Sequence, residues 1–196
     1  MNRHLESRTP TQPGTSALAL LVVSLVALAI AIAIAPARSH AAEIVPSYGL
    51  TRSVDGGDQV KGMFGLALRG NIIPNVLQSE IGAGYRTEDM SGGALHVRQW
   101  PITASLLISP MNVVYAGAGV GWYHTTYDYE DDALGDETVQ KFGVHVGGGI
   151  KVPVAPRVAL DLGGRYVKLQ DQESKLIPEK FDPSFWTLSM GLALKF

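Results

Sequence analysis

His124 and Thr126 are the two side chains whose types and spacing come closest to catalytic chemistry. They lie two residues apart in a segment whose apolar residues alternate, so a β-strand would place both on one face. An imidazole next to a hydroxyl can act as a base that activates a nucleophile, provided that a third group orients the imidazole. The sequence assigns no acidic residue to that third role. We therefore expect a non-enzymatic protein, with an enzyme built on this pair as the alternative.

Other patterns that could bind a ligand favour structural interpretations. The glycines at 117, 119 and 121 are spaced like part of a nucleotide-binding loop, but no helix follows that could offer its amino terminus to a phosphate. The acidic segment 128–137 has the carboxylates that hard cations prefer, yet it lacks the spacing of an EF-hand. Because the chain has no cysteine, disulfides, thiolate zinc sites and thiol catalysis are excluded. We expect no cofactor and no metal site, and whether the acidic segment attracts divalent cations stays open.

The first 41 residues differ in kind from the rest of the chain. Arg3 and Arg8 precede an apolar run at 17–35, and small residues, Ser39 and Ala41, follow it. This order is typical of a secretory signal peptide, so we expect 1–41 to be cleaved after Ala41 and 42–196 to form one domain. An uncleaved membrane anchor is the alternative, because the run is long enough to span a bilayer. Residues 42–196 hold 13 basic and 17 acidic residues, a balance that does not predict nucleic-acid binding.

Beyond residue 42, segments with period-two alternation are separated by turn-forming residues, as expected for β-strands. The eight expected strands cover residues 44–52, 60–69, 76–87, 95–108, 113–127, 139–152, 157–169 and 184–196. Their connections alternate between long and short, the long ones being about 53–59, 88–94, 128–138 and 170–183. An even number of antiparallel strands with this alternation predicts an all-β fold, an eight-stranded up-and-down transmembrane β-barrel. Pro101 lies inside one strand, where we expect a bulge.

One face of each expected strand is apolar, and in the second to eighth strands this face bears an aromatic residue toward the long connections. We call these residues the interface aromatics, because rings with polar tips favour the membrane–water boundary. They are Phe64, Tyr85, Trp100, Trp122, Phe142, Tyr166 and Trp186, with Phe196 at the end of the last strand. The sequence therefore predicts a lipid-facing exterior. A soluble lipocalin-like binding barrel, the alternative, would turn the same face inward.

The opposite face of the strands is rich in glycine, serine and threonine and holds isolated charges. Because an eight-stranded barrel is just wide enough for side chains to fill it, we expect these charges to pair and plug the interior. A conducting pore is the alternative. The predicted interior polar network comprises Arg69, Glu80, Arg86, Lys141, His145, Asp161 and Arg165.

Several stretches carry a resemblance to a known family. They are 115–123 (YAGAGVGWY), 142–151 (FGVHVGGGIK), 161–166 (DLGGRY) and the terminal Phe196. With these the chain resembles the small outer-membrane β-barrel domain family of OmpA, OmpX and OmpW type. The resemblance implies a place in a Gram-negative outer membrane and insertion by the barrel-assembly machinery. It also implies contact with outer-membrane lipid and lipopolysaccharide. Cations could then bridge the acidic segment 128–137 to the phosphates of lipopolysaccharide. It implies no single activity, because one fold carries many functions.

We expect a monomer with a role in envelope structure, surface interaction or passage of small hydrophobic compounds. The outward His124 and Thr126 also resemble the arrangement of base and nucleophile in lipid A deacylases, although that family uses serine where this chain has threonine. A lipid A-directed hydrolase is therefore the enzymatic alternative.

Overall fold

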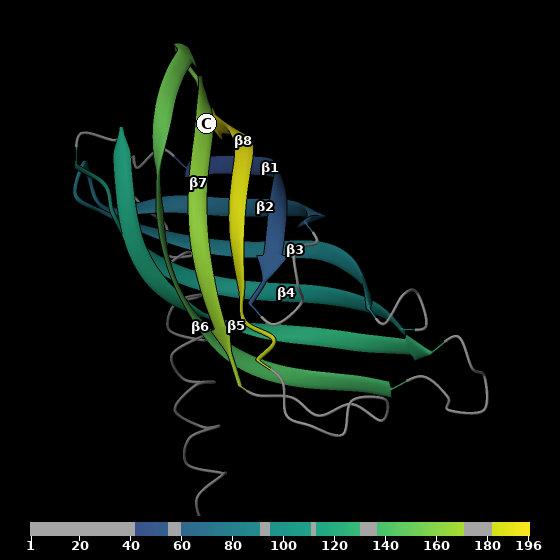
Figure 1. Cartoon of the computed structure of the whole chain (residues 1–196). Coiled ribbons are helices and arrows are strands. Elements are labelled where there is room, and N and C mark those ends of the chain that lie inside the picture. Colours follow the sequence, from purple (N-terminus) through teal and green to yellow (C-terminus); the bar gives the residue numbers. More distant parts are fainter. Residues whose placement is uncertain (1–41, 55–59, 91–94, 111–112, 130–136, 171–181) are drawn as a thin grey trace, which may run out of the picture.

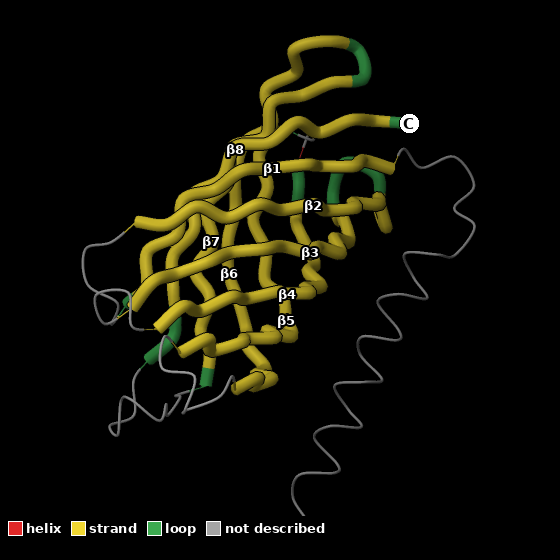
Figure 2. Tube along the Cα trace, turned by 90° about the vertical axis from the view of Figure 1, so that its right-hand side faces the viewer, coloured by secondary structure: helices red, strands yellow, loops and turns green. Residues whose placement is uncertain are grey.

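The computed structural model describes residues 42–54, 60–90, 95–110, 113–129, 137–170 and 182–196. These residues form one closed antiparallel barrel in which each strand pairs with its neighbours in sequence and β1 pairs with β8 (Figures 1 and 2). The strands are β1 Ala42–Ser53, β2 Val60–Ile73, β3 Leu77–Met90, β4 Leu95–Ile108, β5 Val114–Tyr129, β6 Glu137–Ala155, β7 Val158–Leu169 and β8 Phe185–Lys195. Within the described part of the chain, no helix is long and apolar enough to cross a membrane. The predicted eight-stranded up-and-down barrel is confirmed.

The short connections lie at the end of the barrel that also holds the start of β1 and the end of β8. There, Phe196 donates its backbone N–H to the carbonyl of Ala42 over 3.1 Å. In Figure 1 the β6–β7 turn stands at this end, near the marked carboxyl terminus. The β2–β3 turn is closed by a hydrogen bond from Val76 to Ile73, and Asn75 takes a positive φ of 59°, which asparagine tolerates better than most residues.

The predicted bulge at Pro101 is wrong. β4 keeps one register with β5 through Pro101↔Tyr123, and its pairing with β3 passes from Ala83↔Ile102 to Arg86↔Gln99 without a shift. Proline removes one ladder donor but need not insert an extra residue. The register shifts occur instead next to two short turns, between Asn71 and Ile73 and between Pro153 and Ala155.

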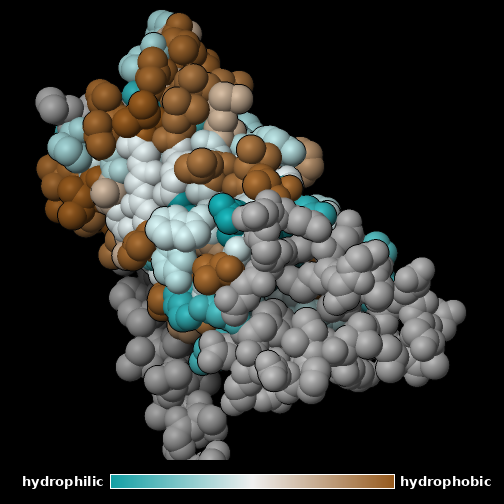
Figure 3. All heavy atoms as spheres, viewed as in Figure 1, coloured by the Kyte–Doolittle hydropathy of each residue, from teal (hydrophilic) through white to brown (hydrophobic). Residues whose placement is uncertain are grey.

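The outer face of the barrel is apolar along the middle of the strands. Large hydrophobic side chains are exposed on the outer face, for example Leu188 at 71%, Ile102 at 62% and Leu66 at 54%. Figure 3 shows apolar residues gathered over much of the upper part of the visible barrel. Most of the fully buried side chains inside are polar or charged. This arrangement is the inverse of a soluble barrel and contradicts the lipocalin-like alternative.

Candidate functional site

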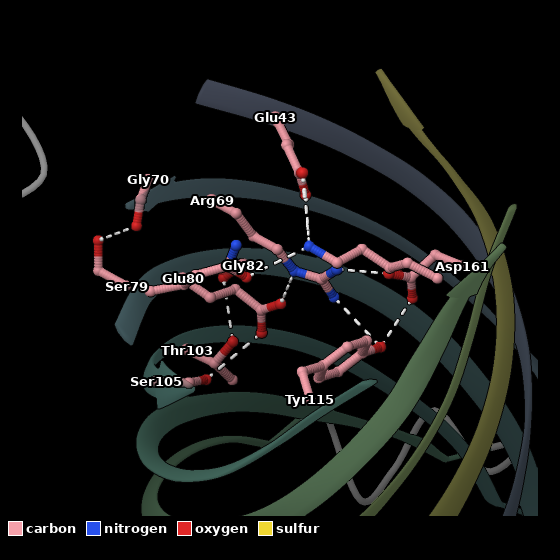
Figure 4. A network of polar contacts seen from close by, with 12 residues as sticks. Glu43, Arg69, Gly70, Ser79, Glu80, Gly82, Thr103, Ser105, Tyr115 and Asp161 are labelled. Atoms are coloured by element: carbon pink, nitrogen blue, oxygen red, sulfur yellow. Dashed lines mark hydrogen bonds and ion pairs between the residues drawn. The ribbon is translucent and has the colours of Figure 1, made fainter. Parts of the chain in front are cut away.

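A layer of charged side chains crosses the barrel interior, and Arg69 of β2 lies at its centre. Its Nε donates to Glu80 Oε2 of β3 over 2.7 Å, and its Nη1 donates to Asp161 Oδ2 of β7 (Figure 4). Arg165 of β7 donates from Nη2 to Glu80 Oε1 over 2.6 Å. Because β3 and β7 lie on opposite sides of the eight-membered ring, this layer spans the lumen. We call these four residues, with Tyr115, the charged layer.

Tyr115 of β5 completes the charged layer. Its hydroxyl donates to Asp161 Oδ1 over 2.8 Å, and the Arg69 guanidinium carbon lies 4.5 Å from the centre of its ring. Two glycines make the space for this ring. A Cβ at Gly149 or Gly163 would lie 2.5 or 2.8 Å from the Tyr115 hydroxyl. The inward glycines therefore fit the large polar side chain that crosses over them.

Two groups of polar contacts extend the charged layer. On one side, Ser105 donates to Glu80 Oε1 over 3.4 Å and lies 2.9 Å from His145 Nε2. Toward the short-turn end, Lys151 of β6 donates to Glu43 Oε2 of β1 over 3.1 Å and to Gln78 Oε1 of β3 over 3.3 Å. Lys151 is 1% exposed and Glu43 is 5% exposed, so this second ion pair is also buried.

An aromatic and aliphatic layer lies further toward the long connections. Tyr123 of β5 and Phe185 of β8 meet edge to face at 6.2 Å between ring centres, with Val167 and Leu169 of β7 in the same cluster. The Arg86 guanidinium carbon lies 4.0 Å from the centre of the Phe185 ring, an arrangement that favours attraction between cation and ring. We call the four aromatic and aliphatic side chains, together with the Arg86 that stacks on Phe185, the apolar layer. They come from β3, β5, β7 and β8, so they also reach across the lumen.

A cavity of about 120 Å³ is lined by residues of both layers. Arg165, Glu80 and His145 contribute from the charged side, and Tyr123 and Phe185 contribute from the apolar side. The Tyr123 hydroxyl and His145 Nδ1 are buried without a hydrogen-bond partner among the described protein atoms. A cavity of this size, with these polar groups in its wall, has room for several water molecules that would satisfy them.

Most of the predicted interior network lies inside, but its members do not all pair with one another. Arg69, Glu80, Asp161 and Arg165 form ion pairs, His145 bonds to a hydroxyl, and Arg86 stacks on a ring. Lys141 faces inward opposite Tyr123 and is half-buried, and no described residue forms an ion pair with it.

The prediction of the interior network missed Glu43 and Lys151. Lys151 shares the inward parity of His145, which was visible in the sequence. Glu43 was missed because the first strand was expected to start at Ile44, two residues after its observed start at Ala42.

The predicted interface aromatics form pairs across neighbouring strands. With Tyr48 included, one pair of outward rings stands below each long connection, and the four pairs are Tyr48–Phe64, Tyr85–Trp100, Trp122–Phe142 and Tyr166–Trp186, with ring centres 4.4–6.1 Å apart. Phe196 is 66% exposed at the opposite, short-turn end. Such ring pairs each add a modest stabilisation to the sheet.

Among the residues that the structure describes, His124 and Thr126 are not part of a catalytic triad. Both lie on the outward face, but the Thr126 hydroxyl contacts the Thr138 hydroxyl at 3.3 Å. Across the described ranges, no hydrogen bond joins His124 to Thr126 or to a carboxylate. The enzymatic alternative therefore has a hydroxyl and an imidazole on one face without the orientation that nucleophilic catalysis requires.

An apolar exterior, a polar filled interior and complete strand pairing define a small transmembrane β-barrel of the bacterial outer-membrane class. A family model described as "Outer membrane protein beta-barrel domain" matches residues 15–196. The chain belongs to this family. No protein with a curated description matches the sequence.

Solved structures show the same fold at low identity. Neisserial surface protein A aligns with a TM-score of 0.59 and 19% identity over 80% of this chain and 97% of that one. The attachment invasion locus protein Ail of Yersinia pestis, in complex with the heparin analogue sucrose octasulfate, gives 0.56 and 18% over 81% and 99%. The N-terminal barrel domain of Pseudomonas aeruginosa OprF gives 0.53 and 12% over 81% and 100%.

Proposed function

We propose that this chain is a non-enzymatic, monomeric outer-membrane barrel with a closed lumen, serving the envelope as a structural and surface-interaction protein. The proposal includes export by the signal peptide 1–41 and insertion by the barrel-assembly machinery. The observation that carries it is the pair of layers that reach across the lumen. A barrel whose interior is filled from opposite walls offers its outer face and its long connections for function.

The charged layer is a barrier both for ions and for apolar compounds. Arg69 and Arg165 together hold Glu80 and Asp161, so an ion entering the lumen meets charges that are already neutralised and hydrogen-bonded. An apolar compound would have to displace buried ion pairs, which is costly in a low-dielectric interior. The geometry therefore favours a closed barrel over passage of small hydrophobic compounds.

The surface role rests on the long connections, whose composition can be read from the sequence. Segment 128–137 contains six acidic residues and no basic residue. The complex of Ail contains a sulfated heparin analogue, which is a polyanion. Asp128, the first of these residues, is paired with Arg98. Because like charges repel, we propose that the five acidic residues beyond Asp128 select cationic partners or divalent cations rather than a polyanion.

A closed lumen predicts no stable ion conduction. When the mature protein purified from membranes is inserted into planar lipid bilayers in concentrated potassium chloride, we expect no reproducible single-channel steps. A porin added to the same bilayer serves as the positive control. Regular steps of one size from the purified protein would contradict the closed lumen.

A further inference from the structure

Cationic side chains point outward next to the interface aromatics on several strands. Arg52 of β1 lies opposite Trp186, Arg98 of β4 lies two residues beyond Trp100, and Lys168 of β7 lies two residues beyond Tyr166. At about 3.3 Å per residue and a tilt of about 45°, two residues correspond to roughly 5 Å of height. The cations therefore stand at the level of lipid headgroups on the long-connection side.

Arg98 has several outward residues with hydrogen-bonding side chains near it in the strand register. It lies opposite Thr126, and His124 lies opposite Trp100, so Arg98 and His124 are diagonal neighbours about 7 Å apart on one face. Gln140 of β6 lies opposite His124. Arg98, His124 and Gln140 are all exposed. We call these three residues the Arg98 patch.

We propose that the Arg98 patch binds the phosphate of an anionic lipid headgroup in the leaflet on the long-connection side. Arg98 supplies a permanent charge and several N–H donors, which suit phosphate oxygens. His124 of β5 and Gln140 of β6 add further N–H donors beside Arg98. The rings of Trp100 and Trp122 directly below favour the boundary at which headgroup and acyl chain meet. The proposal depends on the outer-membrane placement but not on the closed lumen, so the two can fail separately.

The Arg98 side chain is already held by a weak competitor. Its Nη2 donates to Asp128 Oδ2 over 3.0 Å, and both side chains are substantially exposed, at 46% and 40%. An exposed ion pair of this kind contributes little to stability. Asp128 thus keeps the guanidinium on the outer face while a phosphate, with more acceptor oxygens and charge, can replace it.

The experiment compares binding of lipid A, with and without its phosphates, to the mature protein in non-ionic detergent by native mass spectrometry. Inorganic phosphate at matched concentration separates a lipid site from a free-phosphate site. Arg98→Gln is expected to lower the affinity for phosphorylated lipid A about fivefold, the effect of one cation near an anionic surface. Asp128→Asn, which removes the competitor, is expected to raise it about two- to fivefold. Arg157→Gln is the matched control, because it removes the same charge from the exposed short-turn end.

The expected pattern is opposite shifts for Arg98→Gln and Asp128→Asn, no change for Arg157→Gln, and loss of the differences with dephosphorylated lipid A. Equal losses in Arg98→Gln and Arg157→Gln would overturn the proposal, because they would show a general charge effect. Weaker binding by Asp128→Asn would overturn it in favour of a cation bridge through the carboxylate. Equal binding of inorganic phosphate would replace the lipid with a free anion.

Discussion

Arg69→Met is expected to lower the free energy of unfolding by about 3–5 kcal/mol, the cost of removing one partner from a buried ion pair. Arg69 is 5% exposed and bonds to both Glu80 and Asp161. Without Arg69, Glu80 still has the cation Arg165 as a partner. Asp161 keeps only the hydrogen bond from the Tyr115 hydroxyl and remains a buried carboxylate without a cation. The measurement is urea unfolding of the protein in lipid vesicles, followed by the mobility of unheated samples on gels.

Arg98→Met is the matched control for this prediction, because it removes the same charge from an exposed ion pair. We expect a loss of about 1 kcal/mol or less from it. Adding Asp161→Asn to Arg69→Met should recover part of the loss, since it removes the carboxylate that the first substitution leaves uncompensated. Equal losses from Arg69→Met and Arg98→Met would contradict the charged layer as a source of stability.

Gly149→Ala is the second substitution with a large expected effect. A Cβ at this position would lie 2.3 Å from the Leu162 carbonyl oxygen and 2.5 Å from the Tyr115 hydroxyl. Because the carbonyl belongs to the neighbouring strand, relief requires a backbone shift as well as displacement of Tyr115 from Asp161. Overpacking of a filled interior costs about 1–3 kcal/mol. We expect a loss of at least that size, measured by urea unfolding in vesicles as above.

Gly164→Ala tests whether this effect is steric. Gly164 is on β7 next to Gly163, the register partner of Gly149, but its side points outward, and a Cβ there would come no closer than 3.5 Å to Leu188 Cδ2. The change should leave stability unaltered or raise it by about 0.4–1 kcal/mol through the unfolded chain. Equal losses in the free energy of unfolding from Gly149→Ala and Gly164→Ala would contradict the prediction. They would show that these glycines matter for the strand backbone and not for the space that Tyr115 occupies.

The alternation of the strands made most of this fold predictable. Parity alone placed Arg69, Glu80 and Asp161 inside and Phe64 and Trp186 outside, because successive strand residues point to opposite faces. Turn residues located the strand ends to within a few residues. The β2 end was missed because Gly70 and Asn71 continue the strand before the turn at 74–76.

Partners across the lumen were not predictable in the same way. Parity gives a side of the sheet, but the height of a residue depends on the stagger between strands, which local periodicity does not contain. Glu43 and Lys151 are 108 residues apart in sequence and meet only because β1 and β6 close around one ring. The pairing of Lys141 stays a prediction: its inward parity is right, and no ion pair joins it to a carboxylate among the residues that the structure describes.

The central claim is that the apolar register faces lipid while polar layers fill the interior, and tryptophan fluorescence tests it most directly. All three tryptophans of the chain, Trp100, Trp122 and Trp186, lie on the outward register. In vesicles we expect strong quenching by lipids brominated near the headgroup, weaker quenching by lipids brominated at the chain ends, and little quenching by aqueous iodide. Quenching by iodide alone, with no effect of brominated lipid, would contradict the account.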